Sequence, residues 1–322
     1  MQKENLLSAV LHAITVPKAK DERRSAMRSQ PGGRRPAGMF ICSMLIFGTI
    51  GVFRRYIPVS SAFLAFSRGI LGGLCILLFL RLKRKAPGEK LPRRALPGLI
   101  VSGALIGFNW MLLFEAFNYT TVAVATLCYY MAPTVVMLLS PLLFHEKLTP
   151  LKAACAVAAV AGMALVSGVF ENGGMQGSQL RGVLFGLGAA FLYAAVIILN
   201  KKHAGLEPYS KTTVQLISAG TVMIPYLLLT GGFRMEGMHF SAAVLLLVVG
   251  VVHTGLAYVL YFGSMDSLRV QTIAILSYID PVSALLFSAL LLREPLSLLN
   301  GIGAVLVIGS AVVSELRKKA ES

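Results

Sequence analysis

Long, uninterrupted apolar runs constrain this chain more than any other feature. The run at 242–252 reads AAVLLLVVGVV, and similar stretches follow one another along most of the sequence. Hydrophobic residues make up 56% of the 322 residues, charged residues make up only 14%, and the mean hydropathy is +0.74. Soluble domains carry about 25% charged residues, so this composition indicates a membrane protein.

The lengths of the runs predict how the chain crosses the membrane. A helix needs roughly 20 apolar residues to span the hydrocarbon core. A transmembrane β-barrel is a poor alternative, because its strands alternate polar and apolar residues whereas these runs are continuous. We therefore predict an all-α membrane protein. Its ten transmembrane helices lie at about 38–53, 61–80, 96–117, 122–144, 151–170, 182–199, 212–230, 242–263, 272–292 and 298–314.

The chain also contains an internal repeat. A shift of 148 residues without a gap aligns 107–166 with 255–314, and 15 of the 60 positions are identical. Shared Leu, Ala and Val carry little information in so apolar a chain, but shared Gly, Tyr, Pro, Ser and Glu carry more. The informative pairs are Gly107 with Gly255, Tyr130 with Tyr278, Pro133 with Pro281, Ser140 with Ser288 and Glu146 with Glu294. Internal repeats of this kind are typical of transporters, whose sites lie between the halves.

The distribution of positive charge predicts the orientation. With the N-terminus in the cytoplasm, 24 of the 30 Lys and Arg residues lie on the cytoplasmic side and five lie outside, while Arg68 lies within a helix. This asymmetry follows the positive-inside rule. Because five helices per half is an odd number, the second repeat is predicted to be inverted relative to the first. Anionic lipid headgroups at the cytoplasmic face are sufficient partners for the basic loops. We therefore predict that the protein binds membrane lipids and no nucleic acid.

The repeats define the predicted domain organisation. Residues 37–170 form the first five-helix repeat and 180–316 the second, with a short cytoplasmic tail at 317–322. Residues 1–36 are polar and basic, and their apolar stretch at 6–16 is too short to span. They are expected to be a cytoplasmic tail, either disordered or forming an interfacial helix, unless translation begins at Met27 or Met39.

Ionisable residues inside the predicted helices are few. They are costly in a membrane and usually face a bundle interior or water. Asp280 is the most informative, because it lies mid-helix directly before Pro281 and could pair with a cation such as Arg68 or carry a proton. Glu115 and His253 are the other proton-coupling candidates. Each has a structural alternative: Glu115 could reach the interface, Arg68 could snorkel, and His253 could simply be hydrogen-bonded to a neighbour.

Aromatic residues and prolines recur at equivalent places in the two repeats. Trp110 aligns with Tyr258, and Tyr130 with Tyr278, in positions well inside the predicted helices. Such side chains suit an amphipathic small molecule, although packing or an interfacial belt would also explain them. Pro133 and its counterpart can kink their helices, which would serve either a lined cavity or ordinary packing.

The same sequence indicates which chemistries are absent. Cys42, Cys75, Cys128 and Cys155 have no paired spacing and are expected to be small apolar residues, so we predict neither a disulfide nor a metal site. No GxxxxGK[ST] motif occurs, which leaves direct drive by ATP unsupported. No cofactor is predicted.

Two stretches carry a resemblance to a known family. They are 107–149 (GFNWMLLFEAFNYTTVAVATLCYYMAPTVVMLLSPLLFHEKLT) and 270–297 (VQTIAILSYIDPVSALLFSALLLREPLS). Over about 38–316 the chain resembles the EamA-type branch of the drug/metabolite transporter superfamily. This resemblance implies ten helices, cytoplasmic termini in the cell membrane and a central substrate cavity. The substrate-binding residues it implies are Asn109, Trp110, Tyr129, Tyr130, His253, Tyr258, Tyr278 and Asp280.

The function that follows is a secondary transporter or facilitator of small organic metabolites working by alternating access. Export of amino acids or related metabolites is the expectation at the level of the family. Repeat one has Ala132 where repeat two has Asp280, so the cavity is not expected to be symmetric in charge. The alternatives are a membrane channel and a membrane-embedded enzyme or sensor. An enzyme should show a paired catalytic set and a sensor should append a soluble output domain, and neither pattern is found.

Overall fold

The computed structural model describes residues 34–82, 91–144, 149–167, 177–203, 205–233, 238–265 and 267–318. Every regular element within these residues is helical. The first half of the chain contains α2 (Arg34–Gly48), α3 (Ile50–Arg55), α4 (Ser61–Leu82), η1 (Arg93–Ala95), α5 (Leu96–Tyr119), α6 (Val122–Tyr129), α7 (Ala132–Phe144) and α8 (Pro150–Val166). The second half contains α9 (Gly177–Lys202), α10 (Pro208–Thr230), α11 (Phe240–Gly250), η2 (Val251–Leu256), α12 (Ala257–Met265), α13 (Val270–Ser277), α14 (Ile279–Leu291) and α15 (Leu298–Lys318). Most of the predicted tails, 1–33 and 319–322, lie outside the described residues, as does Glu146.

Among the described residues, seven helices are long and apolar enough to cross a membrane. Four of them combine consecutive elements: α2 with α3, η1 with α5, α6 with most of α7, and α11 with η2 and α12. Three shorter apolar helices lie at 150–166, 275–291 and 298–314. The prediction of an all-helical protein with several membrane-crossing helices is therefore confirmed.

The limits of the helices follow from local chemistry. Thr121 and Thr149 precede α6 and α8, and their hydroxyls accept hydrogen bonds from Val124 N and Lys152 N. These bonds satisfy backbone N–H groups that have no partner within the first helical turn. At the other end of a helix, Gly231 closes α10 with φ of 64°, the left-handed conformation that glycine adopts without steric cost.

Equivalent helices of the two repeats run antiparallel to one another. The offset of 148 residues relates α4 to α10, and these two helices pack closely. A methyl group added at Gly69 would lie 2.9 Å from Gly220 Cα, while one added at Gly73 would lie 2.9 Å from Ile217 Cγ1. Because the contact moves towards the start of α10 as it moves towards the end of α4, the two helices point in opposite directions, as an inverted repeat requires.

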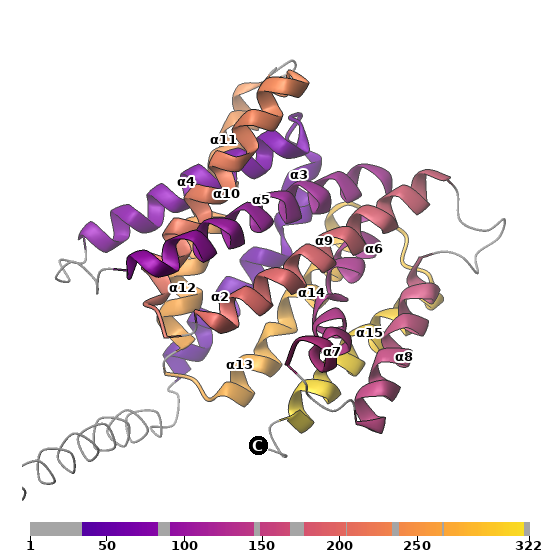
Figure 1. The fold of residues 1–322 in the computed structure, drawn as a ribbon. Helices are drawn as coiled ribbons and strands as arrows, with labels where there is room; N and C mark the ends of the chain where they lie inside the picture. Colours follow the sequence, from indigo (N-terminus) through magenta and orange to yellow (C-terminus); the bar gives the residue numbers. More distant parts are fainter. Residues whose placement is uncertain are drawn as a thin grey trace, which may run out of the picture.

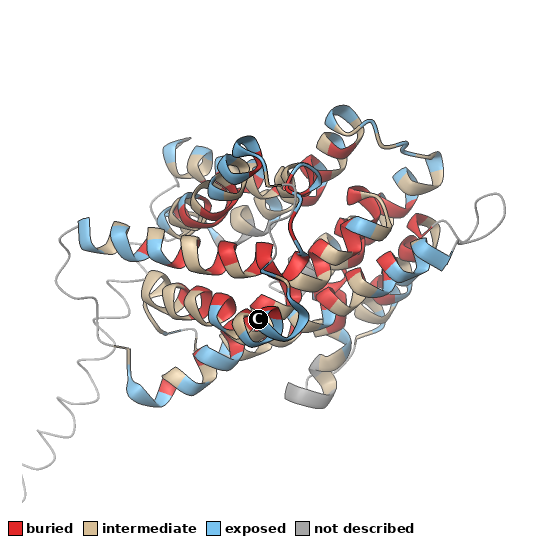
Figure 2. Cartoon of the chain, turned by 90° about the horizontal axis from the view of Figure 1, so that it is seen from above, coloured by how far each residue is buried: buried red, intermediate tan, exposed pale blue. Residues whose placement is uncertain are grey.

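Other helix contacts also occur in equivalent pairs. The pairing of α5 with α9 corresponds to that of α2 with α12, and α7 on α9 corresponds to α14 on α2. The equivalent helices α8 and α15 pack against each other at one side of the bundle (Figure 1). Figure 2 shows buried residues where helices meet and exposed residues on their outer surfaces, and many of those exposed residues are apolar. An apolar outer surface is what a lipid environment requires.

The bundle has two distinct ends. At one, the Tyr209 end, the ring of Tyr209 lies 5.5 Å from that of Phe79 and 6.0 Å from that of Phe262, so the start of α10 meets the ends of α4 and α12. At the other, the Arg55 end, Arg55 is ion-paired with Glu294.

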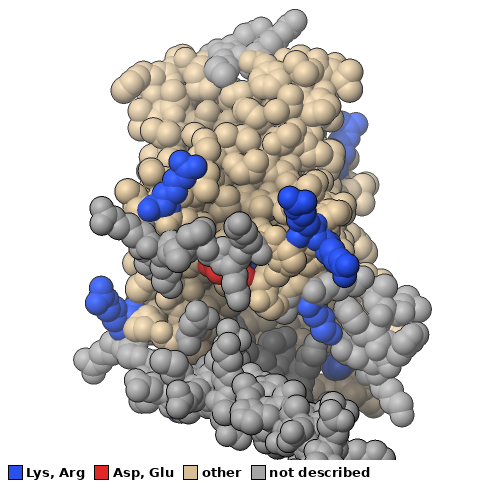
Figure 3. Space-filling model, turned by 60° about the vertical axis from the view of Figure 1, so that its left-hand side comes forward, with Lys and Arg blue, Asp and Glu red and all other residues tan. Residues whose placement is uncertain are grey.

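The two ends differ in the number of exposed basic side chains that they carry. Figure 3 looks towards the left-hand side of Figure 1, where α4 ends, and shows Lys and Arg side chains spread over that face. Exposed basic residues next to helix ends at the Tyr209 end are Arg35, Arg81, Arg93, Arg94, Lys201 and Arg269, against Arg55, Arg181 and Arg293 at the Arg55 end. The Tyr209 end is therefore the more basic of the two within the described residues.

Candidate functional site

A cavity of about 380 Å³ lies in the middle of the bundle. Its walls come from both repeats: α2 to α7 supply one part, and α9, α10, α12, α13 and α14 supply the other. The volume falls in the range of pockets that bind small molecules. Most of its lining is apolar or aromatic, with a few charged and amide side chains, which is the composition of a site for a small organic ligand.

Six of the eight predicted substrate-binding residues lie in these walls. They are Asn109, Trp110, Tyr129, Tyr130, Tyr258 and Asp280. His253 and Tyr278 lie outside the walls of this cavity, and so does the proton-coupling candidate Glu115. The structure thus brings six predicted residues together, while the roles assigned to all of them stay predictions.

Two helix interruptions shape the centre of the cavity. α6 ends at Tyr129 and α7 begins at Ala132, while α13 ends at Ser277 and α14 begins at Ile279. Both interruptions come directly before the prolines of the repeat, Pro133 and Pro281. A proline lacks the N–H that the helix needs, and its ring clashes with the preceding turn. The break in repeat two brings Asp280 to the cavity wall.

Asp280 and Tyr130 connect the two interruptions. The Tyr130 hydroxyl donates a hydrogen bond to Asp280 Oδ2. The two residues belong to different repeats and are 150 positions apart in the sequence. The ion pair of Asp280 with Arg68 that the sequence suggested is not formed, since Arg55–Glu294 is the one ion pair among the described residues.

Arg68 and Lys211 are the cationic residues of the cavity wall, and only 6% of the surface of Arg68 is exposed. Its Nε donates a hydrogen bond of 2.8 Å to Thr254 Oγ1, and its guanidinium carbon lies 4.1 Å from the centre of the Trp110 ring. Thr254 belongs to η2, a π-helical turn, and its hydroxyl also bonds to Val249 O at 3.1 Å. Single π-helical turns are frequent at functional sites, and this one supplies the partner of Arg68.

His253 lies in the same turn but faces elsewhere. Its Nε2 is 2.8 Å from Thr49 Oγ1, and its ring packs edge-on against Phe53 at 4.5 Å between ring centres. The Thr49 hydroxyl also lies 2.8 Å from Ile46 O, to which it donates. These contacts tie the π-helical turn to the break between α2 and α3.

Glu115 belongs to a polar cluster towards the Arg55 end. Its Oε2 accepts hydrogen bonds from the Ser61 hydroxyl at 2.6 Å and from Asn118 Nδ2 at 3.2 Å. The buried Arg54 completes the cluster, because its Nη2 donates to Ser61 Oγ at 3.4 Å and to Asn118 Oδ1 at 3.2 Å. Glu115 thus has fixed partners in this structure.

Several wall residues were missed by the sequence analysis. Tyr193 comes from α9, and its ring lies 5.1 Å from that of Tyr129. Gln215 comes from α10, and its Nε2 donates to Ser102 Oγ at 2.7 Å and to Asn200 Oδ1 at 2.8 Å. The gapless alignment covered only the last three helices of each repeat, so it gave no signal for α9 and α10.

The two ends of the cavity differ in exposure. Towards the Tyr209 end the walls include Asn200, Lys211 and Phe262, which are half-buried, together with Thr212 and Gln215, which are buried. Towards the Arg55 end the lining includes Leu113 and Phe117, which are buried.

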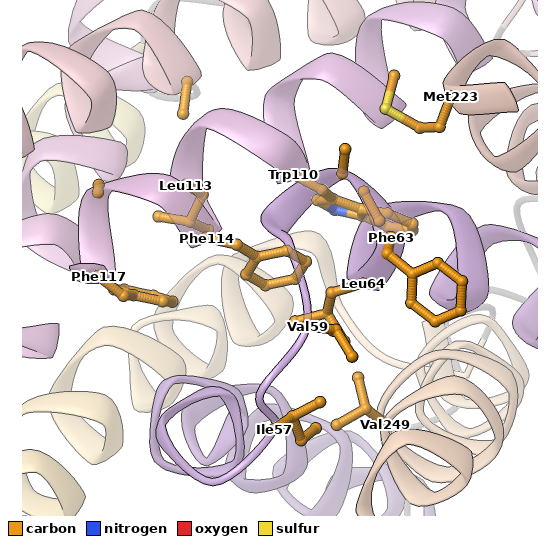
Figure 4. Packing of buried hydrophobic residues seen from close by; sticks show 14 of the residues in the cluster. Ile57, Val59, Phe63, Leu64, Trp110, Leu113, Phe114, Phe117, Met223 and Val249 are labelled. Atoms are coloured by element: carbon orange, nitrogen blue, oxygen red, sulfur yellow. The ribbon is translucent and has the colours of Figure 1, made fainter. Parts of the chain in front are cut away.

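A cluster of apolar residues lies beyond Phe117, at the Arg55 end. Ile57 and Phe114 are almost fully buried there. Figure 4 shows Ile57, from the segment after α3, beside Val249 of α11, and both belong to the same cluster as Val59 and Phe114. The cluster packs the bundle tightly on this side of the cavity.

Glu294 links three helix ends at the surface of the Arg55 end. Its Oε1 lies 2.8 Å from Arg55 Nη2, and its Oε2 accepts from Val122 N at 2.8 Å and from the Ser288 hydroxyl. A carboxylate at a helix N-terminus satisfies a free N–H and interacts favourably with the helix dipole. The preceding residue, Arg293, has φ of 56°, a conformation uncommon outside glycine. One carboxylate therefore joins the end of α3, the start of α6 and the end of α14.

Comparison with known proteins agrees with this architecture. A family model described as the EamA-like transporter family matches residues 35–168 and 180–315. The chain is 29% identical over 296 residues to the uncharacterized transporter YxxF of Bacillus subtilis, covering 88% of this chain and 90% of the relative. It is 26% identical over 275 residues to the protein PecM of Dickeya dadantii, covering 82% and 86% of the two chains.

The fold also has a match among solved structures. The match to one crystal structure covers 88% of this chain and 99% of the chain in that structure, with a TM-score of 0.62 and 19% sequence identity. A likeness at this level of identity shows the fold alone. The family model matches each half of the chain separately, with the two matches covering most of its length. The chain is a multi-pass membrane protein that belongs to the EamA-like transporter family.

Proposed function

We propose that this protein is a secondary transporter of small organic metabolites that works by alternating access. Its site is the central cavity between the two repeats. The observation that carries the proposal is the cavity's asymmetry: half-buried walls at the Tyr209 end and a packed apolar cluster at the Arg55 end. Export of amino acids or related metabolites is the form of the function that the family resemblance favours.

The proposed orientation follows from charge. The more basic Tyr209 end faces the cytoplasm of the cell by the positive-inside rule, and ten membrane-spanning segments leave both termini there. The three shorter helices around 150–166, 275–291 and 298–314 then cross the membrane with the seven longer ones. In this orientation the structure corresponds to an inward-facing state. A reporter that is active only outside the cell, fused after Ser322, should be inactive if the C-terminus is cytoplasmic.

We propose that Glu294 acts as a latch, by which we mean a set of contacts that keeps the outer side of the cavity closed. It connects elements of both repeats through one carboxylate, and Phe117 and Ile57 belong to the apolar cluster at the same end. The outward-facing state needs the two repeats to separate at this end, so the latch must break once in each cycle. A pore that is open from side to side would not be sealed here, and this favours a carrier over a channel.

Flux measurements test the proposed function. The purified protein is reconstituted into liposomes, and the flux of a panel of radiolabelled amino acids, nucleosides and sugars is measured against empty liposomes. We expect saturable flux of at least one metabolite and its loss in Trp110→Ala, because Trp110 forms part of the cavity wall. Flux that never saturates, or that survives in this variant unchanged, would contradict a carrier that uses this cavity.

A further inference from the structure

Two short helices from different repeats are joined at both of their ends. α6 of repeat one begins at Val122 and lies against α14 of repeat two (Figure 1). At the Arg55 end, Glu294, which follows α14, accepts a hydrogen bond of 2.8 Å from Val122 N. At the centre of the cavity, the Tyr130 hydroxyl donates a hydrogen bond to Asp280 Oδ2. Each end of the α6–α14 pair therefore has a carboxylate that binds the other repeat.

The α6–α14 pair is closely packed along its length. A methyl group added at Gly48 would lie 3.0 Å from Asp280 O, and one added at Gly51 would collide with Val122. The inner end of the pair is part of the cavity wall, which includes Tyr130 and Asp280. A pathway that runs from the cavity to the Arg55 end between these helices must open along the whole pair. It must therefore break the hydrogen bond at each end.

The bond at the inner end depends on the charge of Asp280. An ionised carboxylate accepts a hydroxyl in a charge-assisted hydrogen bond, which is roughly twice as strong as a neutral one. A protonated Asp280 is neutral and keeps only the weaker form. The proton comes from solution through the cavity, whose wall includes Asp280. The contact between the two repeats therefore weakens when Asp280 takes up a proton.

Two cations share the cavity wall with Asp280. Arg68 of α4 interacts with Asp280 electrostatically, but the two form no ion pair within the described residues. Lys211 of α10 lies in the same wall. Both cations attract an ionised Asp280, yet within the part of the chain that the structure describes its side chain accepts a hydrogen bond from Tyr130 alone. Neither cation therefore replaces the Tyr130 hydroxyl.

The other helices around Asp280 present mostly neutral groups. The titratable ones are phenols, which are neutral near physiological pH: Tyr129 beside Tyr130, Tyr193 of α9, Tyr258 and Tyr261 of α12, and Tyr278 at the end of α13. The residues that α2 and α13 contribute to the cavity wall are Met44, Phe47, Gly48 and Ser277. α3 also packs against α14, but its Arg54 and Arg55 bind Asn118 and Glu294 at the Arg55 end.

We infer that Tyr130 is the positioning residue that ties the charge of Asp280 to closure of the Arg55 end. While Asp280 is ionised, its bond to Tyr130 and the bond of Glu294 to Val122 N together hold α6 against α14. Protonation of Asp280 weakens the inner bond, so the Arg55 end opens more readily. Acid therefore favours the outward-facing state. This inference rests on the proposed function, because it takes the α6–α14 pair to separate during transport.

Accessibility measured as a function of pH tests this inference. In a background without native cysteines, labelling of a cysteine at Ile57 by an impermeant thiol reagent reports opening of the Arg55 end. Labelling of a cysteine at the neighbouring Tyr56, which is exposed, corrects for the pH dependence of the thiol itself. We expect the ratio of the Ile57 rate to the Tyr56 rate to rise about five- to tenfold between about pH 9 and about pH 5, because the charge-assisted bond is lost. A ratio that does not change with pH would overturn the inference.

Two variants distinguish the inner bond from Glu294, which can also be protonated. Tyr130→Phe removes the donor and Asp280→Asn removes the charge, so both should give a high ratio at about pH 9 and lose most of the rise in acid. Tyr119→Phe is the matched control. It removes a hydroxyl from α5, where the ring stacks on Phe185 at 5.6 Å between ring centres, and should keep the whole rise.

The outcomes assign the role as follows. A full rise in Tyr130→Phe would show that the pH dependence comes from another group and would overturn the role of Tyr130. Melting temperatures in detergent show whether the variants fold. If Tyr130→Phe does not fold, Asp280→Asn decides, since a full rise in that variant would contradict the inference as well.

This inference and the proposed function can fail separately. Saturable flux of a metabolite together with a ratio that does not respond to pH would overturn the inference alone. A rise in acid that is lost in Tyr130→Phe, without flux of any metabolite, would support the inference and contradict the transporter.

Discussion

At the scale of single residues, the cavity is defined by buried polar groups whose partners come from distant parts of the chain. Tyr130 and Asp280 meet across 150 residues, and Arg68 and Thr254 across 186. Buried groups of this kind are costly in a membrane unless they have partners or a function. Each of these hydrogen bonds also joins the two repeats, so a substitution at one residue removes a contact that involves both halves.

Asp280 is the residue we expect to couple transport to protons. In proteoliposomes with an imposed pH gradient, Asp280→Asn should still exchange substrate but should no longer accumulate it in response to the gradient. The reason is that an amide at this position cannot take up and release a proton. Glu115→Gln and His253→Gln serve as controls, because both residues have fixed partners outside the cavity wall. Unchanged gradient dependence in Asp280→Asn would remove the proton role from this residue.

At the scale of elements, close contacts between equivalent helices hold the repeats together. Gly69 lies against Gly220, with no room for a larger side chain. Gly69→Leu should therefore destabilise the protein by about 1–3 kcal/mol through overpacking, seen as a lower melting temperature in detergent. Gly301→Leu is the matched control, because Gly301 is exposed on α15 and a methyl group there meets nothing within 4 Å. Equal melting temperatures for the two variants would contradict this packing.

The latch at Glu294 predicts a change in accessibility. In a background without native cysteines, a cysteine at Ile57, which is 1% exposed, reports opening of the Arg55 end to an impermeant thiol reagent. Glu294→Gln removes the ion pair to Arg55 and weakens the bond to Val122 N, so labelling should rise about tenfold. Labelling as slow as in the parent would show that the carboxylate does not hold this end closed.

The control for this experiment is a second helix-capping glutamate. Glu207 accepts from Tyr209 N and Ser210 N at the start of α10, on the opposite end of the bundle. Glu207→Gln makes the same chemical change but should leave labelling at Ile57 unaffected.

Much of the element-level fold could be predicted from the sequence. The runs of apolar residues predicted helices, and Pro133 and Pro281 marked two of the places where helices are interrupted. The alignment of Trp110 with Tyr258 pointed to side chains that do line the cavity. These features are local or repeated, so they leave a signal in the order of residues.

The rest depends on contacts that leave no such signal. Arg68 could be recognised as an intramembrane cation, but the π-helical turn that supplies Thr254 could not. Glu294 was visible only as half of a repeated pair, because its bond to Val122 N depends on how three helix ends meet. The separation of Arg68 from Asp280 likewise depends on packing between helices rather than on sequence position.

At the scale of the whole molecule, the two repeats enclose a cavity, and a packed apolar cluster lies at its Arg55 end. Antiparallel packing of α4 on α10 supports the exchange of inward-facing and outward-facing states by related motions of the two halves. The family model supports a transporter, and the charge pattern predicts that the Tyr209 end faces the cytoplasm.

Counterflow in proteoliposomes tests this account most directly. Liposomes are loaded with an unlabelled metabolite that the protein transports, and entry of the labelled form is followed from outside. Alternating access predicts faster uptake of the labelled metabolite into loaded than into empty liposomes. The reason is that the transporter can return to the outside with unlabelled metabolite bound and exchange it there for the labelled form. Equal rates into loaded and empty liposomes would contradict alternating access through this cavity.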